Sequence, residues 1–208
     1  RGAYNVLTAA RDSGAERVLH VSTDEVYGPA TKDAPCREDD AFRPRSPYAV
    51  AKATAHWLVA NYREAYGLHA STGILFNHES PLRSRRFVTR KIVAAACAIA
   101  GGSRERLTLG NVDIHRDWGW APEYVEAMWL MLQQPRAADY VIATGQSHSL
   151  ADFADAAFRH FGLNWKDHAD SSAGLFRPTD IAYSCGDASK AASMLGWAPK
   201  WAMPQVVQ

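Results

Sequence analysis

A tyrosine and a lysine stand four residues apart in the segment YAVAK, as Tyr48 and Lys52. On a helix this spacing puts both side chains on one face, about one turn apart. Ser46 and Pro47 directly before them are residues that commonly begin a helix. An ammonium close to a phenol lowers the pKa of that phenol from its usual value of about 10. The spacing therefore predicts that Lys52 makes Tyr48 a general base near neutral pH.

A second polar cluster follows an apolar run. The run RVLHV at 17–21 does not alternate with polar residues, which predicts a buried parallel strand, and Thr23, Asp24 and Glu25 come directly after it. Ligands bind at the carboxyl ends of such strands. On an extended strand Asp24 points away from Thr23 and Glu25, so it reaches their ligand only if the backbone bends. Otherwise Asp24 is a structural carboxylate that caps the following loop.

The rest of the chain alternates helical and strand patterns, which is typical of an α/β fold. The expected strands are 17–22, 70–76 and 139–144, and the expected helices are 1–13, 47–66, 87–100, 122–134, 149–162 and a last short one capped by Asp187. Ser149 and Asp152 have the spacing of a helix cap. Three tryptophans are expected in the core, namely Trp118, Trp129 and Trp197.

Composition limits the function classes. The chain has 208 residues, 47% of them hydrophobic and 22% charged, which is enough for a sizeable core in one or two domains. A net charge of +1 without a basic stripe argues against nucleic acid or a membrane surface as the main partner. Three widely spaced cysteines and scattered histidines give no metal-ligand spacing, so we expect reduced cysteines and no catalytic metal. These features predict a cytoplasmic enzyme.

The two polar segments resemble the active site of extended short-chain dehydrogenase/reductases that act on nucleotide-activated sugars. Further strings are similar to the GDP-mannose 4,6-dehydratase family and occur in the same order, namely GILFNHESP at 73–81, FVTRKI at 87–92, RDWG at 116–119, YVEAMWLMLQ at 124–133, VIATG at 141–145 and RPTD at 177–180. The likeness covers nearly the whole chain.

This resemblance implies a Rossmann-type doubly wound parallel sheet with a smaller C-terminal substrate domain. Residues 1–76 and 111–147 would belong to the dinucleotide-binding domain, and residues 77–110 and 148–208 to the sugar-nucleotide domain. The 208 residues contain no glycine-rich phosphate-binding turn after a strand. We therefore expect a chain that lacks the N-terminal part of the domain and does not bind the dinucleotide properly by itself.

The resemblance also implies an activity, the conversion of GDP-mannose to GDP-4-keto-6-deoxymannose with internal recycling of a hydride. Tyr48, Lys52 and Thr23 would act at sugar carbon four, and Glu25 would remove the proton from carbon five. Either Glu25 or Asp24 would supply the acid that expels water. Asp24 stands where GDP-mannose dehydratases have serine, and in this respect the chain is similar to dTDP-glucose 4,6-dehydratases. Another nucleotide-sugar epimerase, decarboxylase or 4-keto reductase, or an inactive structural subunit, remains an alternative.

Binding residues follow from the same resemblance. It places His78 and Arg83, together with Lys52, at the cofactor, which would be NADP with NAD as a possibility. It places four residues at the nucleotide and diphosphate of the substrate, namely Asn77, Lys91, Arg116 and Arg177. Arginine forks suit phosphate oxygens, although a loop histidine and surface ion pairs are the structural alternatives. Helices 1–13 and 47–66 resemble those that pair subunits, which implies a homodimer or homotetramer.

Overall fold

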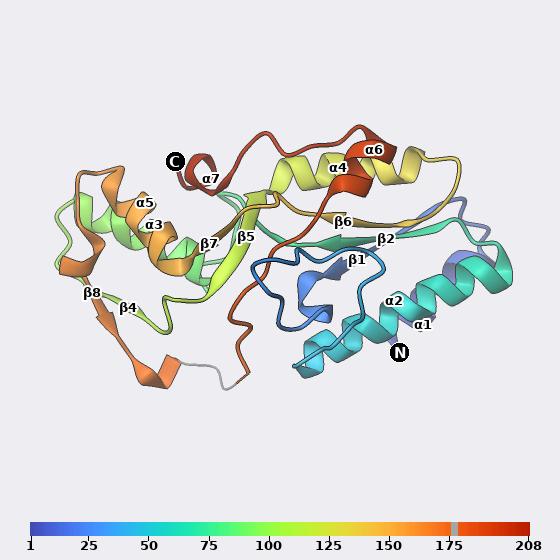
Figure 1. Cartoon of the computed structure of the whole chain (residues 1–208), viewed down its shortest axis with the longest axis horizontal. Coiled ribbons are helices and arrows are strands. Elements are labelled where there is room, and N and C mark those ends of the chain that lie inside the picture. Colours follow the sequence, from blue (N-terminus) through green and yellow to red (C-terminus); the bar gives the residue numbers. More distant parts are fainter. Residues whose placement is uncertain (176–178) are drawn as a thin grey trace.

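The computed structural model describes residues 1–175 and 179–208 and alternates helices with strands (Figure 1). In chain order the elements are α1 (Gly2–Asp12), β1 (Val18–Thr23), the 3₁₀ turn η1 (Asp24–Val26), α2 (Pro47–Tyr66), β2 (Ala70–Leu75), β3 (Asn77–Glu79), α3 (Val88–Ala100), β4 (Leu107–Leu109), β5 (His115–Trp120), α4 (Ala121–Gln133), β6 (Asp139–Ile142), β7 (Ser147–Ser149), α5 (Leu150–Arg159), η2 (Trp165–Asp167), β8 (Ala169–Ser171), η3 (Ala173–Leu175), α6 (Ser189–Leu195) and α7 (Met203–Val207).

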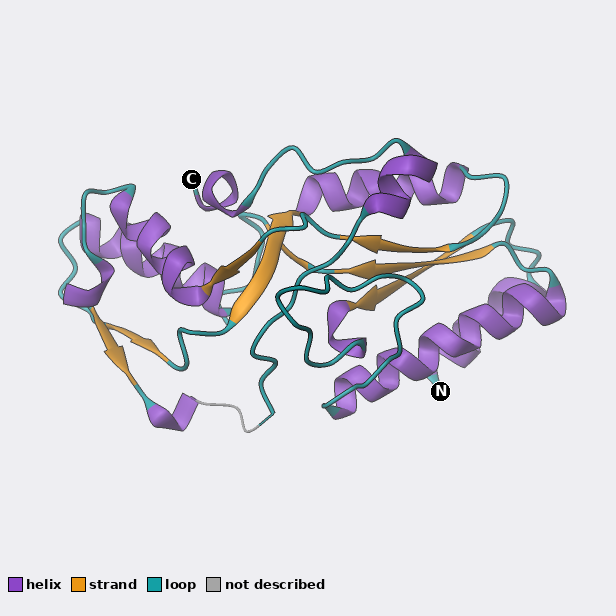
Figure 2. Ribbon diagram, in the orientation of Figure 1, coloured by secondary structure: helices purple, strands orange, loops and turns teal. Residues whose placement is uncertain are grey.

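A three-stranded parallel sheet, in the order β1-β2-β6, forms one half of the molecule. Every residue of β2 is buried, because helices cover both faces of the sheet. Figure 2 shows α1 and α2 on one face and α4 and α6 on the other. The expected α/β class is confirmed.

Helix α2 begins and ends where the sequence predicted. The Ser46 hydroxyl accepts a hydrogen bond from the backbone N–H of Ala49 at 3.0 Å, and Pro47 occupies the first turn, where its missing N–H costs nothing. Gly67 ends the helix with φ of 64°, a left-handed conformation that favours glycine. The Ser46 cap fixes the first turn of α2, and this turn lies beside the carboxyl end of β1.

The other half of the molecule contains strands that the sequence did not predict. Strands β3, β5 and β7 form one small sheet, and β4 pairs with β8 in another. Helices α3, α5 and α7 bury a shared apolar cluster with β4 and with Trp118 of β5. Ser149 and Asp152 form the expected reciprocal cap at the start of α5. The short helix after Asp187 is α6, and α7 follows it, so the prediction of a single last helix is wrong.

One tryptophan does not lie where the sequence placed it. Trp118 and Trp197 are buried as expected, but Trp129 on α4 is 60% exposed. Tyr124, Ala127 and Met131 face the sheet from α4, and Trp129 lies on the opposite side of this helix. Its prediction as a core residue is therefore wrong.

The C-terminal segment connects the two halves. After residue 179 the chain runs beside β5, where Ser184 N donates to the carbonyl of His115 at 3.1 Å, and then passes the end of β6. Gly186 approaches so closely that a Cβ there would lie 2.5 Å from the Cβ of Ala143. Helix α6 then packs against α4 and β6. The division into two domains stays a prediction.

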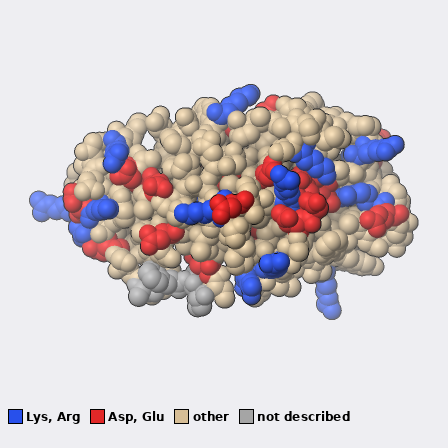
Figure 3. Space-filling model, viewed as in Figure 1, with Lys and Arg blue, Asp and Glu red and all other residues tan. Residues whose placement is uncertain are grey.

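The surface mixes both signs of charge. On the face drawn in Figure 3, Lys and Arg side chains are interspersed with Asp and Glu. None of the helices in the described part of the chain combines the length and apolar character needed to span a bilayer.

Candidate active site

The backbone bends at the carboxyl end of β1. Thr23 is still extended, with φ of −149° and ψ of 149°, and residues 24–26 then form the turn η1. The Thr23 hydroxyl accepts a hydrogen bond from the backbone N–H of Glu25 at 3.4 Å and so caps this turn. The strict alternation expected of a strand therefore ends at Thr23, and the two carboxylates diverge after it.

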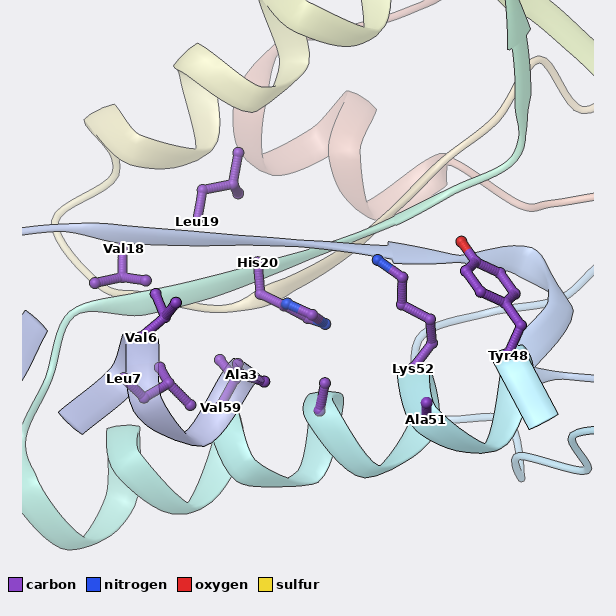
Figure 4. A pocket seen from close by; sticks show the side chains of 11 residues that line it. Ala3, Val6, Leu7, Val18, Leu19, His20, Tyr48, Ala51, Lys52 and Val59 are labelled. Carbon is purple, nitrogen blue, oxygen red and sulfur yellow. The ribbon is translucent and has the colours of Figure 1, made fainter. Parts of the chain in front are cut away.

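Tyr48 and Lys52 lie one turn apart on α2, as their spacing predicts, and both face β1 (Figure 4). The Lys52 ammonium donates to the carbonyl oxygen of Val21 at 2.7 Å and lies 5.8 Å from the centre of the Tyr48 ring. Tyr48 is 52% exposed, so a ligand can reach its hydroxyl.

The pKa of Tyr48 is raised and not lowered, which corrects the expectation from the sequence. Partial burial is the largest cause, and the Glu25 carboxylate is the next. Thr23 and Arg83 act in the opposite direction. Burial also lowers the pKa of Lys52, whose ammonium is directed at a backbone carbonyl and not at the phenol oxygen.

Glu25 is the more accessible of the two carboxylates. Its side chain is half-buried and accepts a hydrogen bond from the Ser46 hydroxyl at 3.2 Å. Ser46 is also the cap of α2, so one residue fixes both the start of that helix and the position of Glu25. The bond from Ser46 therefore holds Glu25 at the start of the helix that carries Tyr48, and the charge of Glu25 raises the pKa of that phenol.

Asp24 points into the interior. Its Oδ1 accepts from the Thr23 hydroxyl at 3.2 Å, and its Oδ2 accepts from the Ser184 hydroxyl at 2.6 Å. Burial raises the pKa of Asp24, against the effect of these hydrogen bonds. Ser184 had no signal in the sequence, because it carries no motif and stands 160 residues from its partner.

A pocket of about 370 Å³ lies between α1, β1 and α2. Its walls are mostly apolar, and Tyr48, Lys52 and His20 contribute polar groups (Figure 4). Burial lowers the pKa of His20 to about 4, so its imidazole is neutral at physiological pH. The buried Nε2 of His20 has no hydrogen-bond partner in the described residues, which leaves a polar atom for a ligand in this pocket.

The two other candidate cofactor residues lie at and after β3. The Nδ1 of His78 donates a hydrogen bond to the carbonyl oxygen of Phe76 at 2.8 Å, and the His78 ring stacks on Tyr124, with the ring centres 4.8 Å apart. Arg83 lies 3.3 Å from a Glu79 oxygen and covers the ring of Phe87 at 3.7 Å. Neither residue lines the pocket beside Lys52.

The candidate substrate residues are spread over the second half of the molecule. Asn77 in β3 pairs with Trp118 in β5, and its buried Oδ1 finds no partner among the described residues. Arg116 in β5 binds Asp180 at 2.8 Å. Lys91 donates to the carbonyl of Thr108 at 2.6 Å, so it ties α3 to β4. The fourth candidate, Arg177, lies outside the described residues.

A third carboxylate, Asp117, holds the end of β6 to the C-terminal segment. It is fully buried and accepts from Thr144, from the backbone N–H of Gly145 at 2.9 Å and from that of Gly186 at 3.3 Å. Burial raises the pKa of Asp117 to about 6. We refer to Asp24, Asp117 and residues 184–186 as the carboxylate clamp. Sequence reasoning missed Asp117, although it stands within the RDWG string.

Comparison with known proteins gives a consistent result. The family model for GDP-mannose 4,6 dehydratase matches residues 1–208. The chain is 50% identical over 212 residues to GDP-mannose 4,6 dehydratase 1 of Arabidopsis thaliana, covering 100% of this chain and 58% of that protein. It is 48% identical over 216 residues to GDP-mannose 4,6-dehydratase of Sinorhizobium fredii, covering 94% and 61%. The chain thus spans about three fifths of the length of these relatives.

Solved structures agree on the fold. A dTDP-glucose 4,6-dehydratase from Bacillus anthracis in complex with NAD superimposes with a TM-score of 0.89 at 22% identity, covering 100% of this chain and 64% of that one. RMD from Pseudomonas aeruginosa complexed with NADPH gives a TM-score of 0.89 at 23% identity, covering 99% and 69%. At this identity the likeness carries the fold alone, a Rossmann-type α/β fold as the sequence predicted.

Proposed function

The chain belongs to the GDP-mannose 4,6-dehydratase family, and on this premise we propose that the intact protein converts GDP-mannose to GDP-4-keto-6-deoxymannose. One observation carries the proposal. Thr23 and Glu25 stand at the carboxyl end of β1, where Glu25 is bonded to Ser46 at the start of α2, and Tyr48 and Lys52 lie on the first turns of that helix. This arrangement provides a hydroxyl, a phenol and an accessible carboxylate for successive proton transfers.

Tyr48 takes the proton of the hydroxyl on sugar carbon four, and Thr23 bonds the same oxygen. The raised pKa of Tyr48 means that a further positive charge near the phenol must favour its ionised form before it can act as a base. Lys52 is the cation on the same face of α2, with its ammonium 5.8 Å from the centre of the Tyr48 ring.

Lys52 and Tyr48 would hold a nicotinamide dinucleotide at the pocket that they line, and the unbonded Nε2 of His20 offers it a further polar contact. When bound, this cofactor accepts a hydride from carbon four and returns it to carbon six, so no external reductant is consumed. We propose NADP, on the family likeness. His78 would contact it from β3, and Arg83 from the loop that follows this strand.

Glu25 acts after the carbon-four ketone has formed. The ketone acidifies the proton on carbon five, and the Glu25 carboxylate removes it. Protonated Glu25 then returns this proton to the hydroxyl on carbon six, which leaves as water. One carboxylate therefore suffices as base and acid, and its half-exposed position suits both steps.

Arg116, Lys91 and Asn77 would hold the nucleotide and the diphosphate, with Arg177 as a fourth candidate. Arg116 is bonded to Asp180 in this structure, which fixes the plane of its guanidinium.

Mass spectrometry tests the reaction. The full-length protein should convert GDP-mannose to a product lighter by one water when it is incubated with a panel of nucleotide sugars. An epimerase, the nearest rival with this fold, would give a product of unchanged mass. That outcome would reject the dehydratase.

We also propose that α1 and α2 pair subunits into a homodimer or homotetramer. Both helices expose large apolar side chains, among them Val6 at 62% and Trp57 at 63%. Trp57→Asp should therefore lower the molar mass of the full-length protein in light scattering. Trp129→Asp is the matched control, since Trp129 is equally exposed on α4, and it should leave the mass unchanged. A monomeric wild-type enzyme would contradict the proposal.

A further inference from the structure

Arg116 is held in place by three hydrogen bonds within the protein. Its Nη1 donates to the carbonyl oxygens of His115 at 2.8 Å and of Ile181 at 2.5 Å, and its Nη2 donates to Oδ1 of Asp180 at 2.8 Å. The Arg116 side chain is only 14% exposed, and a charge at this depth is costly unless it is paired and hydrogen-bonded. We refer to these three acceptors of Arg116 as the arginine socket.

The two chain segments that form the arginine socket are bonded to each other. The backbone N–H of His115 donates to the carbonyl of Ala182 at 2.8 Å, and the His115 carbonyl also accepts from the backbone N–H of Ser184 at 3.1 Å. Residues 181–184 therefore run alongside β5, and Asp180 comes directly before them. Because the guanidinium of Arg116 is bonded to both segments, it has little freedom to turn.

Two N–H groups of Arg116 are not used by the socket. A guanidinium carries five N–H groups, and the socket accepts three of them. The Nε–H and the second N–H of Nη2 have no acceptor among residues 1–175 and 179–208. Phosphate oxygens are suited to paired N–H groups of one guanidinium. Arg116 can therefore bind a phosphate without giving up any bond to the protein.

We propose that Asp180 is a positioning residue for substrate binding, which holds Arg116 in the orientation that offers its two unused N–H groups to the diphosphate. This inference rests on the proposed role of Arg116 at the diphosphate. Sequence reasoning assigned no role to Asp180, although it ends the RPTD string.

Asp180 has two effects on a bound phosphate, and they have opposite signs. Its negative charge repels the phosphate, but its side chain is 26% exposed, so solvent and salt screen this repulsion. Its hydrogen bond orders the guanidinium of Arg116 beforehand, which spares the ligand the loss of side-chain entropy on binding. We expect the ordering effect to dominate, so that Asp180 strengthens the binding of a diphosphate.

A comparison of two ligands measures this effect without turnover. GDP and guanosine differ only in the diphosphate, so the ratio of their dissociation constants, from ligand-observed NMR titrations of the full-length protein, reports the phosphate contacts. Asp180→Ala should weaken GDP binding about tenfold and leave guanosine binding unchanged, because an untethered arginine must be ordered by the ligand. Asp180→Asn keeps an oxygen for Nη2 and lacks the charge, so it should bind GDP at least as tightly as the wild type.

Asp170→Ala is the matched control. Asp170 forms an ion pair with Arg106 through two bonds of 2.7 Å and 2.8 Å between β8 and the residue before β4, and its loss should leave the ratio unchanged. In an Arg116→Met background, Asp180→Ala should have no further effect on GDP binding.

Asp180→Glu is a second variant, which retains the carboxylate but moves its oxygens by one methylene, so it should also weaken GDP binding. Four results would each overturn the inference: GDP binding by Asp180→Ala that is unchanged or tighter, an equal loss for guanosine, an equal loss in Asp180→Asn, or a loss that persists without the Arg116 guanidinium.

The kinetic consequence is a selective change in KM. Asp180→Ala should raise the KM for GDP-mannose about tenfold with kcat nearly unchanged, because a contact far from the reacting carbons contributes equally to the ground state and the transition state. A fall in kcat at unchanged KM would contradict the inference. Failure of the proposed function is a separate result, visible as absence of dehydrated product from the wild-type enzyme.

Discussion

The two sides of the carboxyl end of β1 differ in how many of their hydrogen bonds are already made. On the α2 side, Tyr48 is half-exposed and Glu25 has one side-chain partner. On the other side, the carboxylate clamp is buried, and both oxygens of Asp24 and of Asp117 are bonded within the protein. Groups that can still form hydrogen bonds are able to bind a substrate. Groups that are already hydrogen-bonded within the protein hold the chain in place.

The largest effect is expected on the α2 side. Tyr48→Phe should lower kcat by about two to four powers of ten, as for the removal of a general base. The free energy of unfolding should hardly change, since Tyr48 is half-exposed. Steady-state kinetics and urea unfolding of the same full-length preparation measure both. Near-normal turnover in Tyr48→Phe would show that Tyr48 is not the general base.

Glu25→Gln should stop the reaction after its first half. Glutamine keeps the size of the side chain but cannot accept the carbon-five proton, so kcat should fall by about two powers of ten or more. Reduced nicotinamide and an undehydrated 4-keto sugar should then accumulate, which a lasting rise in absorbance reports. Dehydration at the wild-type rate would reject Glu25 as the base.

Asp117 of the carboxylate clamp should influence the free energy of unfolding and its dependence on pH. The pKa of Asp117 is about 6 in the native state, above its usual value of 3.8, so between pH 4 and 6 the native protein retains a proton that the unfolded chain has lost. The contribution of Asp117 to stability therefore falls as pH rises through this window and is constant above it. A shift of about two units corresponds to about 3 kcal/mol.

Asp117→Asn lacks this titration and serves as the reference. Urea unfolding across the window should show that the stability of wild type relative to Asp117→Asn declines from pH 4 to about pH 6.5. A difference that stays level or grows with pH would contradict the assignment.

The smallest effect is expected at two helix caps, of which only one also contacts the candidate active site. Ser46→Ala and Ser149→Ala each remove one helix cap, of α2 and α5, and should each cost about 1 kcal/mol of stability. Only Ser46 also donates to Glu25, so only Ser46→Ala should reduce kcat, by a few-fold. Equal turnover in the two variants would mean that the bond to Glu25 is not used.

The sequence predicted the α2 side better than the clamp, for physical reasons. Helix caps and the four-residue spacing of Tyr48 and Lys52 are local, so α2 and the face on which these two residues lie follow from the sequence alone. Strand β5 contains Arg116 and a fully buried Asp117, a pattern that does not look like a buried strand. The hydrogen bond from Ser184 to Asp24 depends on the tertiary fold, and no local sequence pattern predicts it.

The direction of the pKa shift of Tyr48 could not be predicted from the sequence either. The spacing of Lys52 and Tyr48 is correct, but the ammonium turns to the carbonyl of Val21, and burial together with Glu25 raises the pKa of the phenol. The spacing of two residues along a helix predicts which side chains can come close together. The orientation of each side chain then determines how it changes the pKa of its neighbour.

The clamp also determines when the site can be completed during synthesis of the protein. Ser184 follows Asp24 by 160 residues, and at roughly 5–20 residues per second a ribosome needs about 10–30 s to cover that interval. Once residue 66 has been added, β1 and α2 are both on the nascent chain while Asp24 still lacks its partner. The candidate site is therefore finished late, and a chain released before residue 184 would carry Thr23, Glu25 and Tyr48 without the contact that holds Asp24.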